Sequence, residues 1–176
     1  MKKRLFCDLD GSVCRLHDEI RYLERMYEEG FFLSLRPFLS VVEAINNIAK
    51  EGNVEVYILS SCISEQCREE KKQWVKKFLP AIPKSNYLLP DIGVSKALCL
   101  GHSISYNDVL LDDYNKNLEE WQAAGGHPIK LVNNINHKGL NGPLWTGECV
   151  YERDSAEKIV EDLKTMMESI TPPDAR

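Results

Sequence analysis

The sequence lacks any long hydrophobic run, and its cysteines lack the spacing of a metal site. The apolar stretch after the basic N-terminus is interrupted by Asp8, and no later stretch approaches the roughly 18 apolar residues that a membrane-spanning helix requires. The six cysteines contain no CxxC pair, which disfavours zinc, and without an export signal we expect them to stay reduced. The sequence therefore predicts a soluble, cytoplasmic protein that does not contact a membrane.

Basic residues are also outnumbered by acidic ones. The chain has 22 Lys and Arg against 27 Asp and Glu, which gives a net charge of −5 at pH 7. Because a nucleic acid polymer is bound largely through its phosphates, this balance argues against such a partner. The four histidines show no spacing that would place two on one helix face, so surface or loop positions are expected for all of them, His17 included.

What the sequence does contain is an alternation of short apolar runs and helical segments. The apolar runs predict strands at 5–8, 54–60, 86–89, 108–113 and 129–133, and the apolar period predicts helices over 40–51, 64–79, 116–124 and 154–169. Strands that are apolar on both faces and alternate with helices indicate an α/β fold, with a mostly parallel sheet covered by helices on both faces. A hydrophobic content of 43% in 176 residues suits one core, so we expect a single domain over 1–176.

Three segments depart from this alternation. Residues 14–32, directly after the first strand, form an insertion that holds one predicted amphipathic helix over 15–29. The loop 134–153 is long for a compact domain. The C-terminal residues 171–176 predict a disordered tail.

Polar residues follow the predicted strands at the edge where parallel sheets bind ligands. Two carboxylates about 4 Å apart repel by about 4 kcal/mol at an effective dielectric near 20, so acids that converge at this edge require a cation. Oxygen donors without His or Cys favour Mg²⁺. The residues concerned are Asp8 and Asp10 after the first strand, Ser60 and Ser61 after the second, Lys96 in the loop after the third, and Asp112 and Asp113 after the fourth.

This set of residues predicts phosphate chemistry. With a metal ion and a lysine present, a phosphate monoester can approach a carboxylate, and Asp8 is the candidate nucleophile that would form an aspartyl phosphate. Asp10 is placed to protonate the leaving alkoxide and then to activate water. Gly11 lets the chain turn steeply after the strand, so that both carboxylates face one cavity.

Each of these signals has a simpler interpretation when taken alone. The sequence DLDG is common in turns with solvated acids, and the pair Asp112 and Asp113 can cap the helix that begins near Asn115. Lys96 alone would be read as a surface lysine. The order of the motifs and their placement after successive apolar strands favour a catalytic site.

The sequence resembles the haloacid dehalogenase (HAD) superfamily of phosphohydrolases. The four motifs that carry this resemblance are FCDLDGS, VYILSS, Lys96 in VSKAL, and VLLDD. More narrowly, the chain is similar to the 5′(3′)-deoxyribonucleotidase family. The stretches that carry the narrower match are GFFLSLRP (30–37), AINNIAK (44–50), VYILSSC (56–62), CREEKKQWVKKFLP (67–80), NYLLPD (86–91) and VLLDDYNKN (109–117).

The resemblance implies a Rossmann-like core, Mg²⁺ and an aspartyl-phosphate mechanism acting on a small phosphate monoester such as a deoxyribonucleotide. It makes Asp8 the nucleophile and a metal ligand, Asp10 the acid/base with its backbone carbonyl on the metal, and Asp112 and Asp113 the remaining metal partners. Ser60 and Ser61 would bind phosphate, and Lys96 would orient it. Because Lys96 precedes the last motif by a longer spacing than the family's, Lys84 is the reserve candidate for this role.

The insertion is where the sequence departs most from these nucleotidases. Their cap is a small helical bundle, whereas residues 14–32 supply a short cap, which leaves the site open to larger substrates or requires a second subunit to enclose it. Phe31 and Phe32 either stack on a substrate base or belong to the core. Trp145 is a further candidate substrate contact, although a core or edge position is expected for it.

Two other classes of function remain open from the sequence. A phospho-acceptor receiver module also combines clustered aspartates, a hydroxyl and a lysine, but its acceptor aspartate ends the third strand, where this chain has Leu88 and Leu89. A catalytically silent nucleotide-binding module is the other alternative. The complete set of acids favours the phosphatase.

Overall fold

The computed structural model describes residues 2–20, 22–136 and 144–170 and contains one six-stranded sheet with the strand order β3-β2-β1-β4-β5-β6. All five neighbouring strand pairs are parallel, which confirms the predicted α/β class. The central strands β1 and β4 are buried on both faces because helices cover both. The strands are β1 (Arg4–Cys7), β2 (Glu55–Leu59), β3 (Tyr87–Leu88), β4 (Asp108–Asp112), β5 (His127–Val132) and β6 (Cys149–Tyr151).

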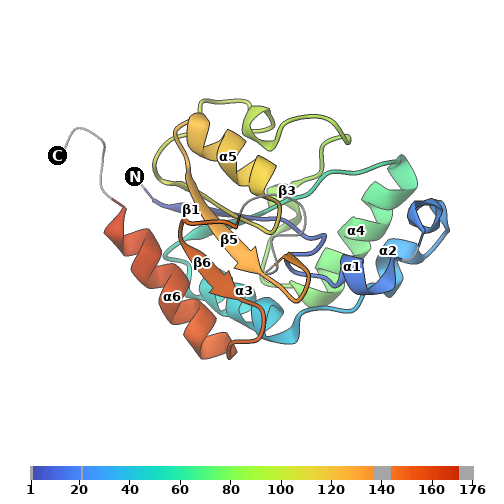
Figure 1. Ribbon diagram of the computed structural model, residues 1–176, viewed down its shortest axis with the longest axis horizontal. Coiled ribbons are helices and arrows are strands. Elements are labelled where there is room, and N and C mark those ends of the chain that lie inside the picture. The colour runs from blue at the N-terminus through green and yellow to red at the C-terminus, as the bar shows by residue number, and fades with distance from the viewer. Residues whose placement is uncertain (1, 21, 137–143, 171–176) are drawn as a thin grey trace.

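Helices form a layer on each side of this sheet (Figure 1). Three long helices, α3 (Leu39–Glu51), α4 (Glu65–Phe78) and α6 (Ala156–Ser169), pack into the larger core cluster. The opposite face is covered by α5 (Asn115–Ala123) and the short 3₁₀ helix η3 (Lys96–Leu98). A further 3₁₀ turn, η2 (Lys84–Asn86), leads into β3.

Alternate side chains of the central strand β1 enter the two cores. Leu5 and Cys7 pack with α3, α4 and α6, while Phe6 packs with Leu118 and Trp121 of α5. All five side chains are buried, so β1 is fixed from both sides. The end of β1, where the predicted catalytic acids begin, is therefore a rigid position.

The insertion leaves and rejoins the core at a narrow neck. The amide of Arg15 donates to the carbonyl of Arg36 at 2.8 Å, and the amide of Phe38 donates to the carbonyl of Val13 at 2.9 Å. Between these bonds the chain forms α1 (Leu16–Glu19), the 3₁₀ helix η1 (Leu23–Tyr27) and α2 (Phe31–Ser34). The single helix predicted over 15–29 is thus wrong, since the segment consists of short helical turns.

A buried carboxylate of α4 fastens the far end of the insertion. Glu70 is 5% exposed, and its two oxygens accept from the amides of Gly30 at 2.7 Å and Phe32 at 3.0 Å. These amides open α2, where backbone donors have no partner within the helix. The insertion is therefore attached to the core at both ends.

Two further expectations concern the C-terminal part of the chain. The loop predicted over 134–153 contains β6, which extends the sheet at its edge, so the prediction of five strands was one short. The predicted tail at 171–176 lies outside the described residues.

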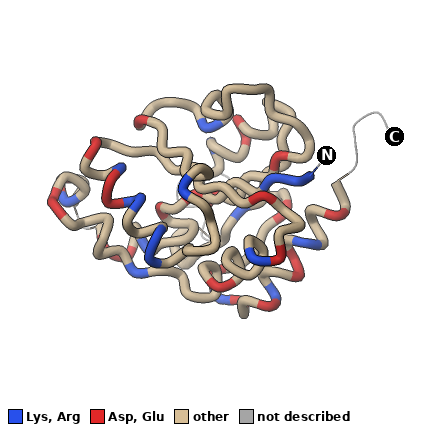
Figure 2. Tube along the Cα trace, turned by 180° about the vertical axis from the view of Figure 1, so that it is seen from behind, with Lys and Arg blue, Asp and Glu red and all other residues tan. Residues whose placement is uncertain are grey.

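Across the part of the chain that the structure describes, no helix combines the length and apolar character needed to cross a bilayer. Acidic and basic residues are interspersed along the trace (Figure 2).

Candidate active site

Three carboxylates meet where β1 and β4 end. Cys7 of β1 is in register with Leu111 of β4, so the next residues of the two strands, Asp8 and Asp112, lie side by side. One oxygen each from Asp8, Asp112 and Asp113 lies within 4.8 Å of the others, and all three side chains are buried. The sheet edge thus brings together the acids that the sequence placed there.

Lys96 lies between two of these carboxylates. Its Nζ donates to Oδ1 of Asp8 at 2.7 Å and to Oδ2 of Asp112 at 2.6 Å, and the side chain is 4% exposed. Burial alone would lower the pKa of Lys96, but the carboxylates of Asp112 and Asp8 outweigh it and hold the pKa above its usual value. Lys84, the reserve candidate, is exposed in η2 before β3, away from the edge where the acids meet.

Asp112 is the most enclosed of the acids. Its side chain is fully buried, and this burial raises its pKa from 3.8 to about 7 against the opposing effect of Lys96. Its oxygens also accept from the Tyr114 amide at 2.9 Å and the Asn117 side chain at 2.9 Å. The carboxylate is therefore held in place by donors from η3, from the turn after β4 and from α5.

A second buried lysine serves Asp10. Lys71 of α4 donates to Oδ2 of Asp10 at 2.6 Å, to Oγ of Ser60 at 3.1 Å and to the carbonyl of Ser61 at 2.6 Å. Burial raises the pKa of Asp10, and Lys71 counteracts this effect. The Asp10 side chain remains 19% exposed, so it can exchange protons with solvent.

Sequence reasoning missed Lys71, although a signal was available. In α4 the buried positions are Cys67, Glu70, Lys71, Trp74 and Val75, which follow the i, i+3, i+4, i+7 pattern of a helix face that packs on a core. Glu70 and Lys71 are charged residues within this apolar stripe. A charge at such a position needs a buried partner, which marks both residues as structural or functional.

Asp113 is oriented by three donors from separate parts of the chain. Ser12 Oγ donates to its Oδ1 at 3.2 Å, Asn133 Nδ2 lies 3.4 Å from its Oδ2, and His17 Nε2 lies 3.2 Å from the same oxygen. Gly11 lies beneath this group with φ +85°, and a Cβ added there would come within 2.5 Å of Asp113 Oδ2. Glycine is required both by this backbone conformation and by this contact.

The aromatic candidates are found in the cores. Phe31 and Phe32 are 3% and 2% exposed and stack edge to face with centroids 5.1 Å apart, which favours the core alternative over stacking on a base. The Phe32 ring also packs 5.0 Å from Lys71 Nζ, so it supports that lysine from behind. Trp145 packs against the core on the α5 face and donates to the Glu148 carbonyl at 3.0 Å, which confirms the expected core or edge position.

The donor set fits a divalent cation. Asp8, Asp112 and Asp113 offer oxygen ligands from three buried carboxylates, the chemistry that Mg²⁺ prefers. When ionised, Asp8, Asp10, Asp112 and Asp113 contribute four negative charges, and Lys71 and Lys96 contribute two positive charges. The two negative charges left over match one divalent ion, so the residues present suit the ion that the fold implies.

Comparison with known proteins assigns the family. The model of the family described as 5′ nucleotidase, deoxy (pyrimidine), cytosolic type C protein matches residues 15–141, more than half of the chain. The match includes Ser60, Lys96 and Asp113, while Asp8 and Asp10 precede it. No match was found among curated proteins.

Solved structures share the fold at low sequence identity. D,D-heptose 1,7-bisphosphate phosphatase from Burkholderia thailandensis aligns with a TM-score of 0.62 and 12% identity over 93% of this chain and 99% of its own. A HAD-superfamily hydrolase from Ehrlichia chaffeensis gives 0.56 and 12% over 95% and 99%. YfnB from Bacillus subtilis, described as a HAD-hydrolase bound to magnesium, gives 0.56 and 9% over 92% and 98%. The chain therefore belongs to the 5′ nucleotidase, deoxy (pyrimidine), cytosolic type C family and is a phosphatase with the HAD fold.

Proposed function

We propose that the protein hydrolyses small phosphate monoesters in a Mg²⁺-dependent reaction through a phosphorylated Asp8, and that deoxyribonucleotide monophosphates are its first candidate substrates. The observation that carries this proposal is the position of Lys96, buried between Asp8 and Asp112, with Asp113 beside them. The family match supports the nucleotide substrate.

Asp8 is the proposed nucleophile. Lys96 holds Oδ1 of Asp8 and thereby fixes the carboxylate, which attacks phosphorus while the bond from phosphorus to the leaving oxygen breaks. Ser60 and Ser61 are proposed to bind the phosphate oxygens. Mg²⁺ held by Asp8, Asp112 and Asp113 would offset the charge of a phosphate dianion near these acids.

Asp10 is the proposed acid and base. Its raised pKa favours the protonated form that a leaving alkoxide needs, and its partial exposure gives water access for the second step. After it has given up its proton, the carboxylate can take one from the water that cleaves the acyl phosphate. Lys71 fixes one oxygen of Asp10 and also contacts Ser60, so it links the acid to the phosphate-binding loop.

The insertion is proposed to act as a short cap. Residues 14–32 form only short helical turns beside the site, so either the substrate remains partly open to solvent or a second copy of the chain completes the enclosure. A homo-oligomer therefore stays a prediction, to be tested by light scattering on the purified protein.

The decisive experiment is a panel of phosphate monoesters assayed with and without Mg²⁺, with nucleotides, sugar phosphates and phosphorylated cofactors included. We expect release of inorganic phosphate only with the metal, and the highest kcat/KM with deoxyribonucleoside monophosphates. Rapid quenching in acid should trap a phosphoryl group that hydroxylamine releases, as expected of an acyl phosphate. Turnover without a trappable acyl phosphate in any rapid-quench sample would contradict the mechanism, while turnover of sugar phosphates alone would contradict the substrate.

A further inference from the structure

One residue of the insertion contacts the proposed metal site. His17, in the short helix α1, places its Nε2 3.2 Å from Oδ2 of Asp113, and its side chain is 38% exposed. Asp113 accepts hydrogen bonds when ionised, so Nε2 carries the proton and donates it. The catalytic steps proposed above do not use this histidine.

The surroundings of His17 indicate a role beyond holding α1. The helix already has another polar contact with the sheet edge, since Asn134 Nδ2 lies 3.2 Å from Oδ1 of Asp18. His17 is directed instead at the oxygen of Asp113 that lies over Gly11, where a Cβ would come within 2.6 Å of the imidazole. The carboxylate is thus held by Ser12 and Asn133 from the core and by His17 from the insertion.

We propose that His17 is a positioning residue for the metal site, and that its imidazole holds the Asp113 carboxylate so that the site reaches its full metal affinity only when the insertion is docked. The inference rests on the proposed metal site of the phosphatase. It places His17 outside the ligand set, because the donor atoms that lie within 4.8 Å of one another come from Asp8, Asp112 and Asp113.

Two consequences follow from this arrangement. Partners that orient a ligating carboxylate change metal affinity by about 10- to 100-fold when they are removed. Coupling between two events is reciprocal, so if docking of the insertion strengthens metal binding, then metal binding must strengthen docking by the same factor. Docking of the insertion can be followed at α1, where the Ile20 amide donates to the Leu16 carbonyl at 3.0 Å. Hydrogen exchange of this amide measures how often α1 opens.

The test measures Mn²⁺ binding to the whole protein by EPR of the free ion, without substrate. We expect His17→Leu to bind Mn²⁺ about 10- to 100-fold more weakly than the unaltered protein. His17→Gln, which keeps an N–H donor at similar reach, should recover most of that affinity. The matched control is His102→Leu, the same change at an exposed histidine that contacts Arg4 at the opposite end of β1, and it should leave Mn²⁺ affinity unchanged.

A second readout separates this role from a structural one. Hydrogen exchange of the Ile20 amide should slow when Mn²⁺ is added to the unaltered protein, and this slowing should be absent in His17→Leu. Equal Mn²⁺ affinity in His17→Leu and the unaltered protein would overturn the proposal, and so would a pulsed EPR coupling to ¹⁴N from a directly bound imidazole. If the unaltered protein binds no Mn²⁺, the metal site itself is refuted, and with it the proposed function.

Discussion

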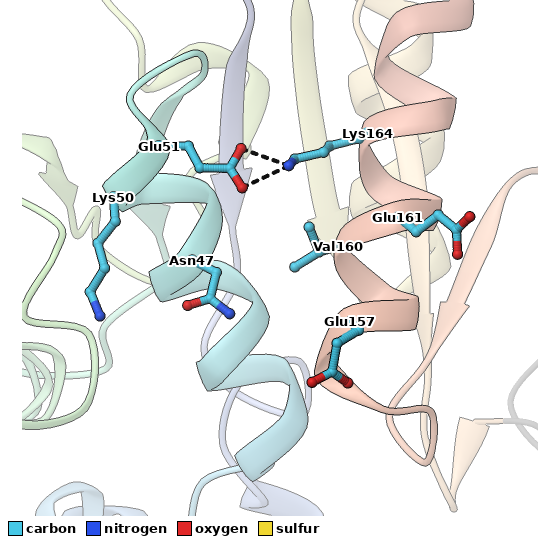
Figure 3. A pocket seen from close by; sticks show the side chains of 7 residues that line it. All are labelled: Asn47, Lys50, Glu51, Glu157, Val160, Glu161 and Lys164. Carbon is cyan, nitrogen blue, oxygen red and sulfur yellow. Dashed lines mark hydrogen bonds and ion pairs between the residues drawn. The ribbon is translucent and has the colours of Figure 1, made fainter.

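Ion pairs in two regions of the molecule have the same chemistry and different surroundings. At the sheet edge, Lys96 lies between Asp8 and Asp112 with 4% of its side chain exposed. Between α3 and α6, Lys164 pairs with Glu51 at 2.6 Å on the side of an open groove, and these side chains are 38% and 40% exposed (Figure 3). The N···O distances in these ion pairs are alike, so the difference between the two regions is how far water reaches the charged groups.

The exposure of an ion pair distinguishes a charge that contributes to folding from one that serves the proposed chemistry. An exposed pair gives about 0 to 1 kcal/mol, because water solvates both partners when they separate. A buried pair gains little over an apolar replacement, but removing one partner leaves an unpaired charge in the interior. The cluster at the sheet edge is therefore a costly arrangement for stability alone, which is consistent with a catalytic role.

The largest expected effect is on turnover in Asp8→Asn. Loss of the nucleophile should lower kcat on the order of 10⁴-fold or more, while Lys96 keeps Asp112 as its partner and the fold persists. Phosphate release and far-UV circular dichroism measure the two properties separately. Near-normal turnover in this variant would mean that the buried cluster at the sheet edge has no more of a catalytic role than the exposed pair between α3 and α6.

Lys96→Met tests the cost of an unpaired buried charge. At pH 8 and without divalent ions, the free energy of unfolding should fall by about 3 to 5 kcal/mol, since Asp8 and Asp112 lose their common partner. Urea denaturation measures this change. At pH 5 the loss should shrink, because burial favours a proton on Asp112.

The pH dependence of metal binding gives the next effect. Burial raises the pKa of Asp112 from 3.8 to about 7, so the metal-free folded protein keeps a proton that the unfolded chain has lost in this range. The resulting stabilisation is present below pH 3.8 and is lost as the pH rises to 7. Mg²⁺ must displace this proton, so its affinity by calorimetry should rise by up to about tenfold per pH unit below 7 and level off above it. Affinity that stays flat from pH 5 to 8 would contradict the assignment of Asp112 as a ligand.

The smallest effect is expected in the exposed pair. Lys164→Ala should change the free energy of unfolding by no more than about 1 kcal/mol, and 0.5 M NaCl should reduce even this difference. Urea denaturation in low and high salt measures it beside Lys96→Met. A loss as large as that of Lys96→Met would mean that the exposure of the side chains does not distinguish the two regions.

The positions of the acids at the sheet edge could be predicted from the sequence, whereas the helical structure of the insertion could not. Asp8 and Asp112 follow runs of apolar residues that have to be buried, so strand ends and acids could be located together. The apolar period of the insertion predicts one helix, but Tyr22 and Leu23 are 70% and 73% exposed, so this period does not mark a face packed on a core. The edge strand β6 has only three residues and carries almost no pattern.

Two residues were missed, for different reasons. Lys71 is one of many charged residues in α4, and only its place in the buried stripe distinguishes it. His17 lies in a helix of four residues, too short for any period, and approaches Asp113 across 96 positions of the chain. Contacts of this kind arise from the path of the insertion, which local sequence does not determine.

The neck between Val13 and Phe38 has a consequence for protein engineering. Since the outgoing and returning backbones are hydrogen-bonded to each other there, the excursion between them starts and finishes at one point of the molecule. Because His17 of α1 and the phenylalanines of α2 contact the core, a bulkier helical lid is best grafted between α1 and α2, where it can alter substrate choice without rebuilding the strands that bear the acids.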